Sequence, residues 1–304
     1  MLTAGLLLAS GPVAGGCGES GVSLQVLGSG GPEADDGRTS SGYLVWQDGK
    51  ARVLADLGSG SMAHFEQAGA RLTDLELILV SHFHVDHSND LPAMLKASWF
   101  TPRERDLLLF GPAGNDRMPG AVDYAGALVG PDGAFRYLSG YLDGGENYRL
   151  VVREVKAAGK QHVEFAPLPD LAVAAVPVHH GPNPALAWRV AVAGTVLVFS
   201  GDMSGRNETL PGLAKDADLL VAHNAVPEDA GPQALALHMP PSVIGRIASE
   251  AGVRRLVLSH RMNRSLGREE ETLALIREFY QGPVDFAEDL QCFAIQAAPV
   301  RSVP

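Results

Sequence analysis

The chain has 304 residues, of which 46% are hydrophobic and 19% are charged. A chain of this length can bury a large core, and this composition excludes a disordered or fibrous protein. The formal net charge is −11, from 35 acidic and 24 basic residues, and no run of Lys and Arg occurs. This argues against nucleic acid as a partner, because binding to many phosphates needs a positive surface.

The N-terminus has features of an export leader. Residues 1–18 carry no charged side chain, residues 6–9 form a short apolar core, and segment 13–17 resembles a bacterial lipoprotein cleavage box ending at Cys17. We expect a leader over 1–18, a single domain over 19–304, and a periplasmic enzyme, either free or anchored by a lipid at Cys17. The positive segment of a usual signal is missing, so a cytoplasmic protein is the alternative. Cys292 is then expected to be an unpaired, buried small hydrophobic residue.

Strand and helix patterns alternate in the first part of the chain. Apolar runs predict strands at 22–27, 42–47, 51–56, 75–80 and 107–110, and helices are predicted at roughly 62–70 and 91–98. Residues 115–170 show no clear period. We expect this segment to form a cap over the active site that determines substrate specificity, and its apolar stretches could serve a homodimer.

Strand patterns return after this segment. They lie at 171–178, 185–192, 195–200 and 256–259, with a helix start and a strand around 211–221. Helices are predicted at 241–251 and 269–280, where apolar residues recur at helical spacing. Both halves of the chain mix strands and helices, which predicts a two-layered α/β sandwich.

Five segments share one layout, in which an apolar strand stops at a His or an Asp. They are 81–87, 179–180, 200–202, 223 and 259–260. The end of a strand can aim a side chain into a cleft at the edge of a sheet. Several such ends that converge would build a metal site.

The first of these segments carries the strongest signal. His82, His84, Asp86 and His87 place three imidazoles and one carboxylate within six residues, and both groups are standard zinc ligands. His82 and His84 can point the same way, because alternate residues of an extended chain share a side. Asp86 and His87 lie past the bend and can face a second metal.

The run 82–87, HFHVDH, matches the HxHxDH signature and resembles the metallo-β-lactamase superfamily. Similar segments follow in order at 180–182, 200–202 and 256–260. In the N-terminal half, segments 27–32, 55–60 and 89–92 resemble the ribonuclease Z and arylsulfatase-like branch. The resemblance runs from about residue 22 to the C-terminus, and it implies the α/β metallo-β-lactamase fold, an αββα sandwich.

The resemblance also implies ligands for two divalent metal ions, with Zn²⁺ as the default and iron or manganese as alternatives. The expected ligands are His82, His84 and His180 for the first ion, Asp86, His87 and His260 for the second, and Asp202 as the bridge between them. His179 is the alternative to His180. The Gly-Pro that follows favours His180, and neighbours on a strand face opposite sides.

Two metal ions that share a water lower its pKa, so a hydroxide can attack a phosphorus, sulfur or carbonyl centre at neutral pH. The candidate catalytic residues are Asp86, His223 and His238. The two histidines correspond to the HEAT and HST segments of ribonuclease Z-like enzymes, but Asn224 stands where those enzymes have a glutamate. A structural role is the alternative for His223. Asp56 is expected either to orient a ligand histidine or to cap its turn.

Three functions fit these features, and each is that of a dinuclear metal-dependent hydrolase. The main hypothesis is an exported enzyme that hydrolyses a small phosphodiester, sulfate ester or related ester, which the leader and the acidic balance favour. A ribonuclease Z-like tRNA 3′-processing endonuclease is the first alternative. The branch resemblance favours it, whereas Asn224 and the lack of a clear basic arm within 115–170 oppose it. A lactonase is the second alternative.

Overall fold

The computed structural model describes residues 17–160 and 162–295. The first half of the chain and one C-terminal strand build a seven-stranded sheet in the order β14-β1-β2-β3-β4-β5-β6. Its strands are β1 (Val22–Gly28), β2 (Gly42–Gln47), β3 (Lys50–Leu57), β4 (Leu77–Leu79), β5 (Leu107–Pro112), β6 (Leu150–Val155) and β14 (Cys292–Ile295). The helical segments of this half are α1 (Ser61–Gln67), α2 (Val85–Ser88), α3 (Leu91–Ser98), α4 (Ala121–Val129), η1 (Arg136–Leu138) and α5 (Gly140–Asp143).

The second half builds another seven-stranded sheet, in the order β13-β12-β11-β10-β9-β8-β7. Its strands are β7 (Val163–Leu168), β8 (Leu171–His180), β9 (Asn183–Val192), β10 (Thr195–Phe199), β11 (Leu219–His223), β12 (Leu256–Ser259) and β13 (Val284–Phe286). Its helices are α6 (Leu210–Leu213), α7 (Pro232–Leu235), α8 (Pro241–Glu250) and α9 (Glu269–Arg277).

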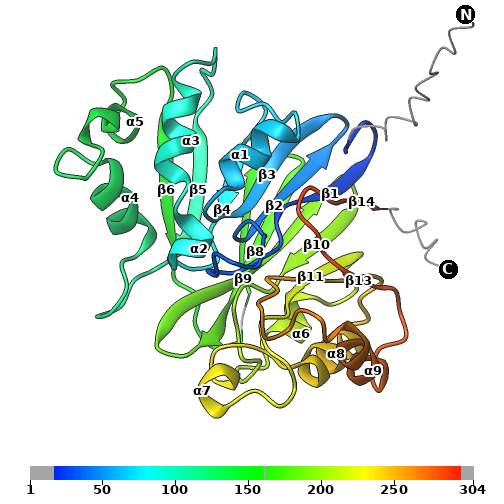
Figure 1. Cartoon of the computed structure of the whole chain (residues 1–304). Helices are drawn as coiled ribbons and strands as arrows, with labels where there is room; N and C mark the ends of the chain where they lie inside the picture. The colour runs from blue at the N-terminus through cyan, green and yellow to red at the C-terminus, as the bar shows by residue number, and fades with distance from the viewer. Residues whose placement is uncertain (1–16, 161, 296–304) are drawn as a thin grey trace, which may run out of the picture.

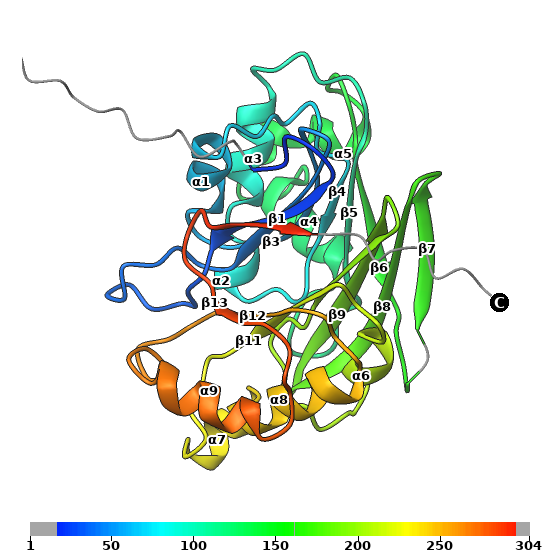
Figure 2. The same ribbon diagram turned by 90° about the vertical axis from the view of Figure 1, so that its right-hand side faces the viewer.

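The two sheets face each other, and helices cover their outer sides (Figures 1 and 2). In Figure 2, α1, α3, α4 and α5 lie on one side of the pair of sheets, and α6 to α9 lie on the other. The molecule is therefore an αββα sandwich, which confirms the fold predicted from the sequence.

Alternation along the strands explains why four layers form. In β2, Tyr43 and Val45 pack into the core between the sheets, whereas Leu44 and Trp46 pack under the helices of the first half. The same alternation operates in β8 and β9, whose other faces pack under α6 and α8. A strand that is apolar on both faces is stable only when both faces are covered.

The strands and long helices predicted from periodicity are present with small shifts at their ends. The segment 115–170, which lacks a period, forms α4, η1, α5, β6 and β7. Residues of α4, η1 and α5 pack into the core under the first sheet. Near the start of this segment, Asn115 donates a hydrogen bond from Nδ2 to the carbonyl of Pro182, 2.9 Å away. Pro182 follows closely after the histidine pair 179–180.

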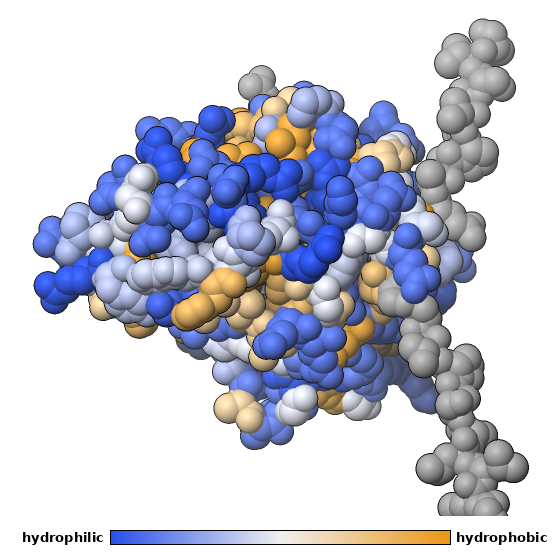
Figure 3. Space-filling model, turned by 90° about the horizontal axis from the view of Figure 1, so that it is seen from above, coloured by the Kyte–Doolittle hydropathy of each residue, from blue (hydrophilic) through white to orange (hydrophobic). Residues whose placement is uncertain are grey.

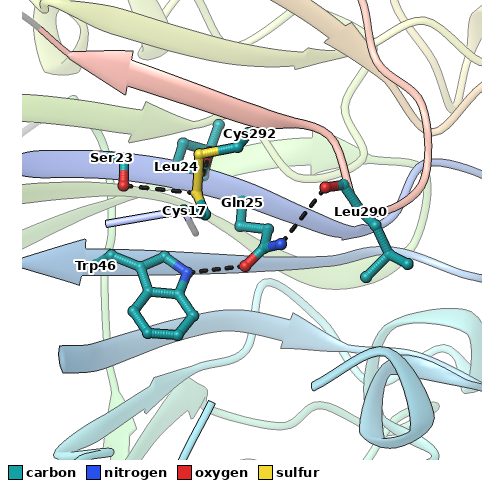
Figure 4. The surroundings of a disulfide bond; sticks show 7 residues. All are labelled: Cys17, Ser23, Leu24, Gln25, Trp46, Leu290 and Cys292. Atoms are coloured by element: carbon teal, nitrogen blue, oxygen red, sulfur yellow. Dashed lines mark hydrogen bonds between the residues drawn. A yellow bond between two sulfur atoms is a disulfide. The ribbon is translucent and has the colours of Figure 1, made fainter. Parts of the chain in front are cut away.

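The cysteines differ from the sequence prediction. Cys17 and Cys292 form a disulfide that links the segment before β1 to the neighbouring strand β14 (Figure 4). The expectation of a lipid anchor at Cys17 is therefore wrong for this structure, because the sulfur is already bonded. Cys292 is not a buried unpaired residue either, since it is exposed on β14. A pairing across 275 positions leaves no local signal in the sequence.

The predicted leader lies almost entirely outside the described residues. Within the part of the chain that the structure describes, no helix has both the length and the apolar character needed to cross a bilayer.

Candidate metal centre

The strand ends singled out in the sequence meet at one edge of the sandwich. The HFHVDH run follows β4, and α2 within it lies where the two halves of the molecule meet (Figure 1). The remaining residues come from the ends of β8, β10, β11 and β12, all in the second sheet. The site is thus built from both sheets.

Backbone contacts between the sheets fix the start of the histidine run. Leu186 on β9 donates its N–H to the Ser81 carbonyl at 2.9 Å, and Trp188 Nε1 donates to the Val80 carbonyl at 3.1 Å. Asp56, at the end of β3, accepts hydrogen bonds from the Ser81 N–H at 2.7 Å and from the Ser81 hydroxyl at 2.8 Å. Strands β9 and β3 therefore position the two residues before His82.

One group of ring nitrogens comes from His82, His84 and His180. His82 Nε2 lies 3.0 Å from His84 Nδ1, and His180 Nε2 lies 3.4 Å from the same His84 nitrogen. His82 and His180 are buried, whereas His84 is half-buried. Nitrogens at these separations match the edges of one metal coordination sphere.

A second group lies deeper. Asp86 Oδ2 is 3.4 Å from His87 Nε2 and 3.3 Å from His260 Nε2. The Nε2 atoms of both histidines are fully buried and have no hydrogen-bond partner among the described residues. Burying a polar atom without a partner is costly, so these two lone pairs fit a metal ion.

Asp202 stands between the two groups. Its Oδ1 lies 3.3 Å from His260 Nε2, while its Oδ2 lies 3.7 Å from both His180 Nε2 and His87 Nε2. Two sets of side chains offer possible ligand atoms within 4.8 Å of one another, and Asp202 belongs to both. The first set is His82, His84, His180 and Asp202. The second set is His87, Asp202, His223 and His260. The imidazole and carboxylate donors suit a divalent metal.

His179 and His180 point in different directions. His180 joins the first group, and its Nδ1 is 2.9 Å from the Leu237 carbonyl. His179 Nδ1 instead lies 2.8 Å from the hydroxyl of Ser204, away from the cluster. The structure thus brings His180 and not His179 to the other ligands.

The expected contact of Asp56 with a ligand histidine is present. Its Oδ2 is 2.8 Å from His87 Nδ1, which leaves His87 Nε2 to face the cluster. Asp56 and His260 both adopt positive φ, at 55° and 52°, a region that non-glycine residues rarely enter. Backbone strain of this kind collects at functional sites.

His223 is completely enclosed. Its Nδ1 is 2.8 Å from Asp202 Oδ1, and its Nε2 is 3.1 Å from the hydroxyl of Tyr43 on β2. Burial lowers the pKa of His223 to about 4, so the ring is neutral at pH 7. Burial also raises the pKa of Tyr43, whose hydroxyl stays protonated. Tyr43 was not predicted from the sequence, because an apolar strand gives no sign that the hydroxyl of one of its residues contacts a buried polar group.

His238 reaches the cluster from the loop between α7 and α8. Its Nδ1 lies 3.7 Å from Asp202 Oδ2 and, within the described chain, has no hydrogen-bond partner. Burial lowers its pKa to about 3. Asn224 is also buried, and neither polar atom of its side chain finds a partner in the described residues.

The buried histidines and carboxylates of the cluster shift one another's pKa values. Burial lowers the pKa values of His82 and His84. Burial alone would do the same to His87, but the surrounding carboxylates, Asp86 first among them, outweigh it and raise the His87 pKa. Burial alone would raise the pKa of Asp202, but the neighbouring histidines hold it well below the usual range. The carboxylates are therefore ionised at neutral pH and ready to bind a cation.

Comparison with known proteins agrees with this geometry. The family model of the beta-lactamase superfamily domain matches residues 51–261. Ribonuclease Z of Haloferax volcanii is 28% identical over 305 residues, covering 87% of this chain and 92% of that protein. Ribonuclease Z of Myxococcus xanthus is 30% identical, covering 78% of this chain and 86% of that protein.

Solved structures give the same fold. The metallo-beta-lactamase fold protein YhfI of Bacillus subtilis superimposes with a TM-score of 0.69 at 19% identity, covering 90% of this chain and 99% of that one. Together, the αββα layers, the His/Asp cluster between the sheets and the matched family show that this chain belongs to the metallo-β-lactamase superfamily of metal-dependent hydrolases, in its ribonuclease Z branch.

Proposed function

We propose that the chain is a two-metal phosphodiester hydrolase. The observation that carries this is the position of Asp202 between the two groups of nitrogens. Its Oδ2 lies 3.7 Å from His180 Nε2 and from His87 Nε2, and its Oδ1 lies 3.3 Å from His260 Nε2. In this proposal seven residues hold two Zn²⁺ ions: His82, His84 and His180 at the first, Asp86, His87 and His260 at the second, and Asp202 between them. Both groups offer only imidazole and carboxylate donors, a set that suits zinc.

A bound metal pair of this kind supplies a hydroxide at neutral pH and stabilises charge on the phosphoryl oxygens. The chain's own residues do the rest. His238 is neutral because its pKa is low, so its N–H can donate to an oxygen of the phosphate as negative charge develops there. Asp86 would hold its metal rather than carry a proton, since its pKa lies far below the usual range.

For the substrate, the relatives favour RNA over a small ester. The similarity to ribonucleases Z extends along 92% and 86% of two of those proteins. We therefore propose cleavage of a phosphodiester near the 3′ end of an RNA, which is the first of the two alternatives predicted from the sequence. The same relatives count against the expectation, drawn from the acidic sequence, that nucleic acid is not a partner.

A small phosphodiester is the second candidate substrate, and two observations favour it. The net charge of −11 weakens binding to a polyanion. The segment 115–170 has no clear basic arm, and its described residues form α4, η1, α5, β6 and β7. A small substrate needs neither a basic surface nor an arm.

The two substrates are separated by one comparison. The purified chain would be assayed with a tRNA precursor carrying a 3′ trailer and with bis(p-nitrophenyl) phosphate, and kcat/KM would be determined for each. Cleavage of the precursor at its 3′ side supports the RNA proposal. Turnover of the small ester with an intact precursor moves the assignment to a small phosphodiester, and hydrolysis of neither contradicts the proposed function.

We also propose that His238 is a catalytic residue and not a ligand. His238→Ala should lower kcat about 100-fold, the lower end of the loss for one donor to a developing oxyanion. Bound metal should stay at the wild-type level, as measured by mass spectrometry of the elemental content. Loss of metal together with activity would show that His238 holds the ion instead.

For localisation, we propose a compartment outside the cytoplasm. The Cys17–Cys292 disulfide supports this, because such bonds persist in oxidising compartments, and the apolar N-terminal sequence agrees with it. Thiols would be blocked with an alkylating reagent in intact producing cells, and the protein mass measured. An unmodified pair of cysteines is expected, whereas two alkylated cysteines would place the chain in a reducing compartment.

A further inference from the structure

The enclosure of His223 leaves it no direct part in the chemistry. Its Nδ1 faces Asp202 Oδ1 and its Nε2 faces the Tyr43 hydroxyl, so both ring nitrogens already have partners. Only 2% of the residue is exposed, and Tyr43 is exposed by 1%. A histidine in this state has no free lone pair for a metal and no free N–H for a substrate.

Tyr43 comes from the opposite sheet. It lies on β2 of the first sheet, whereas His223 and Ser259 are the last residues of β11 and β12 in the second. Its hydroxyl is 2.9 Å from Ser259 Oγ, and its ring lies 5.8 Å from that of Phe199, at the end of β10. The aromatic packing holds the hydroxyl at the ends of three strands that carry the metal cluster.

We propose that Tyr43 is a positioning residue for the metal centre, which acts through His223 to orient the bridging carboxylate of Asp202. This inference rests on the proposed function for its second metal ion, but it assigns a role to residues that touch neither metal nor substrate.

Hydrogen-bond counting gives the direction of each bond. Asp202 Oδ1 is a carboxylate oxygen and can only accept, so His223 must donate from Nδ1. A neutral imidazole has a single N–H, which leaves Nε2 as an acceptor. Among the described contacts of Nε2, the Tyr43 hydroxyl is the donor, and Ser259 Oγ, 2.9 Å from the Tyr43 oxygen, is the other acceptor for the same proton. Tyr43 thus selects the tautomer that binds Asp202.

The tautomer of His223 affects one oxygen of Asp202. Oδ1 faces the deeper group, 3.3 Å from His260 Nε2, and the His223 N–H occupies one of its lone pairs. The other lone pair would then be free to help hold the second metal. Without the Tyr43 hydroxyl, His223 can take the other tautomer and turn an acceptor toward the carboxylate, which repels it. The second metal should be held more weakly.

The first test is Tyr43→Phe, which removes the hydroxyl and keeps the ring. Affinity for the second metal, measured by competition with a chromogenic chelator, should fall about 10-fold or more, within the range for partners of metal ligands. kcat should fall with KM unchanged. The matched control is Tyr148→Phe, which removes a buried hydroxyl 2.6 Å from Ser98 Oγ on the far side of the first sheet, and its metal affinity should equal that of the wild type.

The second test uses His223 itself. Asn places its amide near the position of Nδ1 and Gln near that of Nε2, so His223→Asn should keep more of the second metal than His223→Gln. Adding Tyr43→Phe to His223→Asn should cause no further loss, because the hydroxyl acts through the ring. Wild-type metal affinity in Tyr43→Phe, or additive losses in the double variant, would overturn the proposal. Metal competition needs no substrate, so this result is independent of which ester the enzyme hydrolyses.

Discussion

At the level of single residues, the proposed metal ligands are themselves held by other groups. Asp56 lies 2.8 Å from Nδ1 of His87, the Leu237 carbonyl lies 2.9 Å from Nδ1 of His180, and Ser81 Oγ lies 3.0 Å from Nδ1 of His82. In each pair the second nitrogen is left facing the cluster. Such contacts fix the tautomer and the ring orientation, which lowers the entropy lost when a metal binds.

Removing a ligand should therefore be far more damaging than removing a surface histidine. We expect His84→Ala to lower phosphodiester turnover at least about 100-fold, since even partners of ligands account for 10- to 100-fold, and to lower bound metal while the fold persists. His162→Ala is the control, because His162 is exposed and lies outside the cluster. Full activity in His84→Ala would rule out metal-dependent catalysis.

The pH dependence of metal binding follows from the same residues. The pKa values of His87 and His260 are raised in the metal-free protein by the carboxylates around them, against the effect of burial. Both must be neutral to bind a metal, so binding releases protons, and metal affinity should fall as the pH drops below these raised values. Calorimetry of Zn²⁺ binding in two buffers with different ionisation enthalpies counts the protons, and zero release would contradict this assignment.

At the level of elements, the site depends on close contact between the turn after β3 and the helix α2. A Cβ on Gly58 would lie 2.1 Å from the carbonyl oxygen of Asp86. Gly58→Ala should therefore displace α2, destabilise the fold by about 1–3 kcal/mol and lower bound metal. Denaturant unfolding and metal analysis would measure both effects.

Gly126 in α4 is the matched control for this substitution. A Cβ there meets no atom within 4 Å, so Gly126→Ala should stabilise the helix by about 0.5–1 kcal/mol and leave metal content unchanged. Equal effects of the two substitutions would show that the packing against α2 does not control the site.

The disulfide joins two elements that the sequence leaves far apart. It encloses 275 positions between Cys17 and β14, and closing so long a loop restricts the unfolded chain strongly. Cys292→Ser, or reduction of the wild type, should lower stability by about 2–5 kcal/mol without loss of metal, as measured by thermal unfolding with and without a phosphine reductant. Identical unfolding of the oxidised and reduced chains would contradict a stabilising bond.

Periodicity predicted the elements whose burial is regular. Strand β2 and helix α3 occur at the predicted residues because their apolar spacing reports which faces are covered. The segment 115–170 gave no such signal. η1 and α5 have only three and four residues, and α4 exposes the apolar residues Val122 and Ala127, so its apolar positions do not mark one face. Strands β13 and β14 were missed because, unlike the equally short β4 and β12, they are not fully buried apolar runs.

At the level of the whole molecule, the site is an assembly of distant segments. The HFHVDH run was identifiable because four candidate metal ligands fall within six residues, and the family resemblance then pointed to His180, Asp202 and His260. Tyr43 and the disulfide were not predictable, because each gains its role only when two segments far apart in sequence are brought together.

One face of the molecular surface is mostly hydrophilic. On the face shown in Figure 3, hydrophilic residues predominate and hydrophobic ones lie in small, separate patches. Some large apolar side chains are nevertheless exposed; in the segment proposed to serve a homodimer they are Val122, Phe135 and Tyr137. A protein with this net charge should bind polyanions weakly. If cationic groups of the protein contact the phosphates, its affinity for RNA should fall further as the salt concentration rises.

The most direct test of the central claim measures bound metal and phosphodiester turnover on the same purified, oxidised chain. We predict about two divalent ions per chain and hydrolysis of bis(p-nitrophenyl) phosphate that a chelator abolishes and Zn²⁺ restores. A chain that binds no metal, or whose turnover survives complete removal of the metal, would contradict the claim that this His/Asp cluster is a metal-dependent active site.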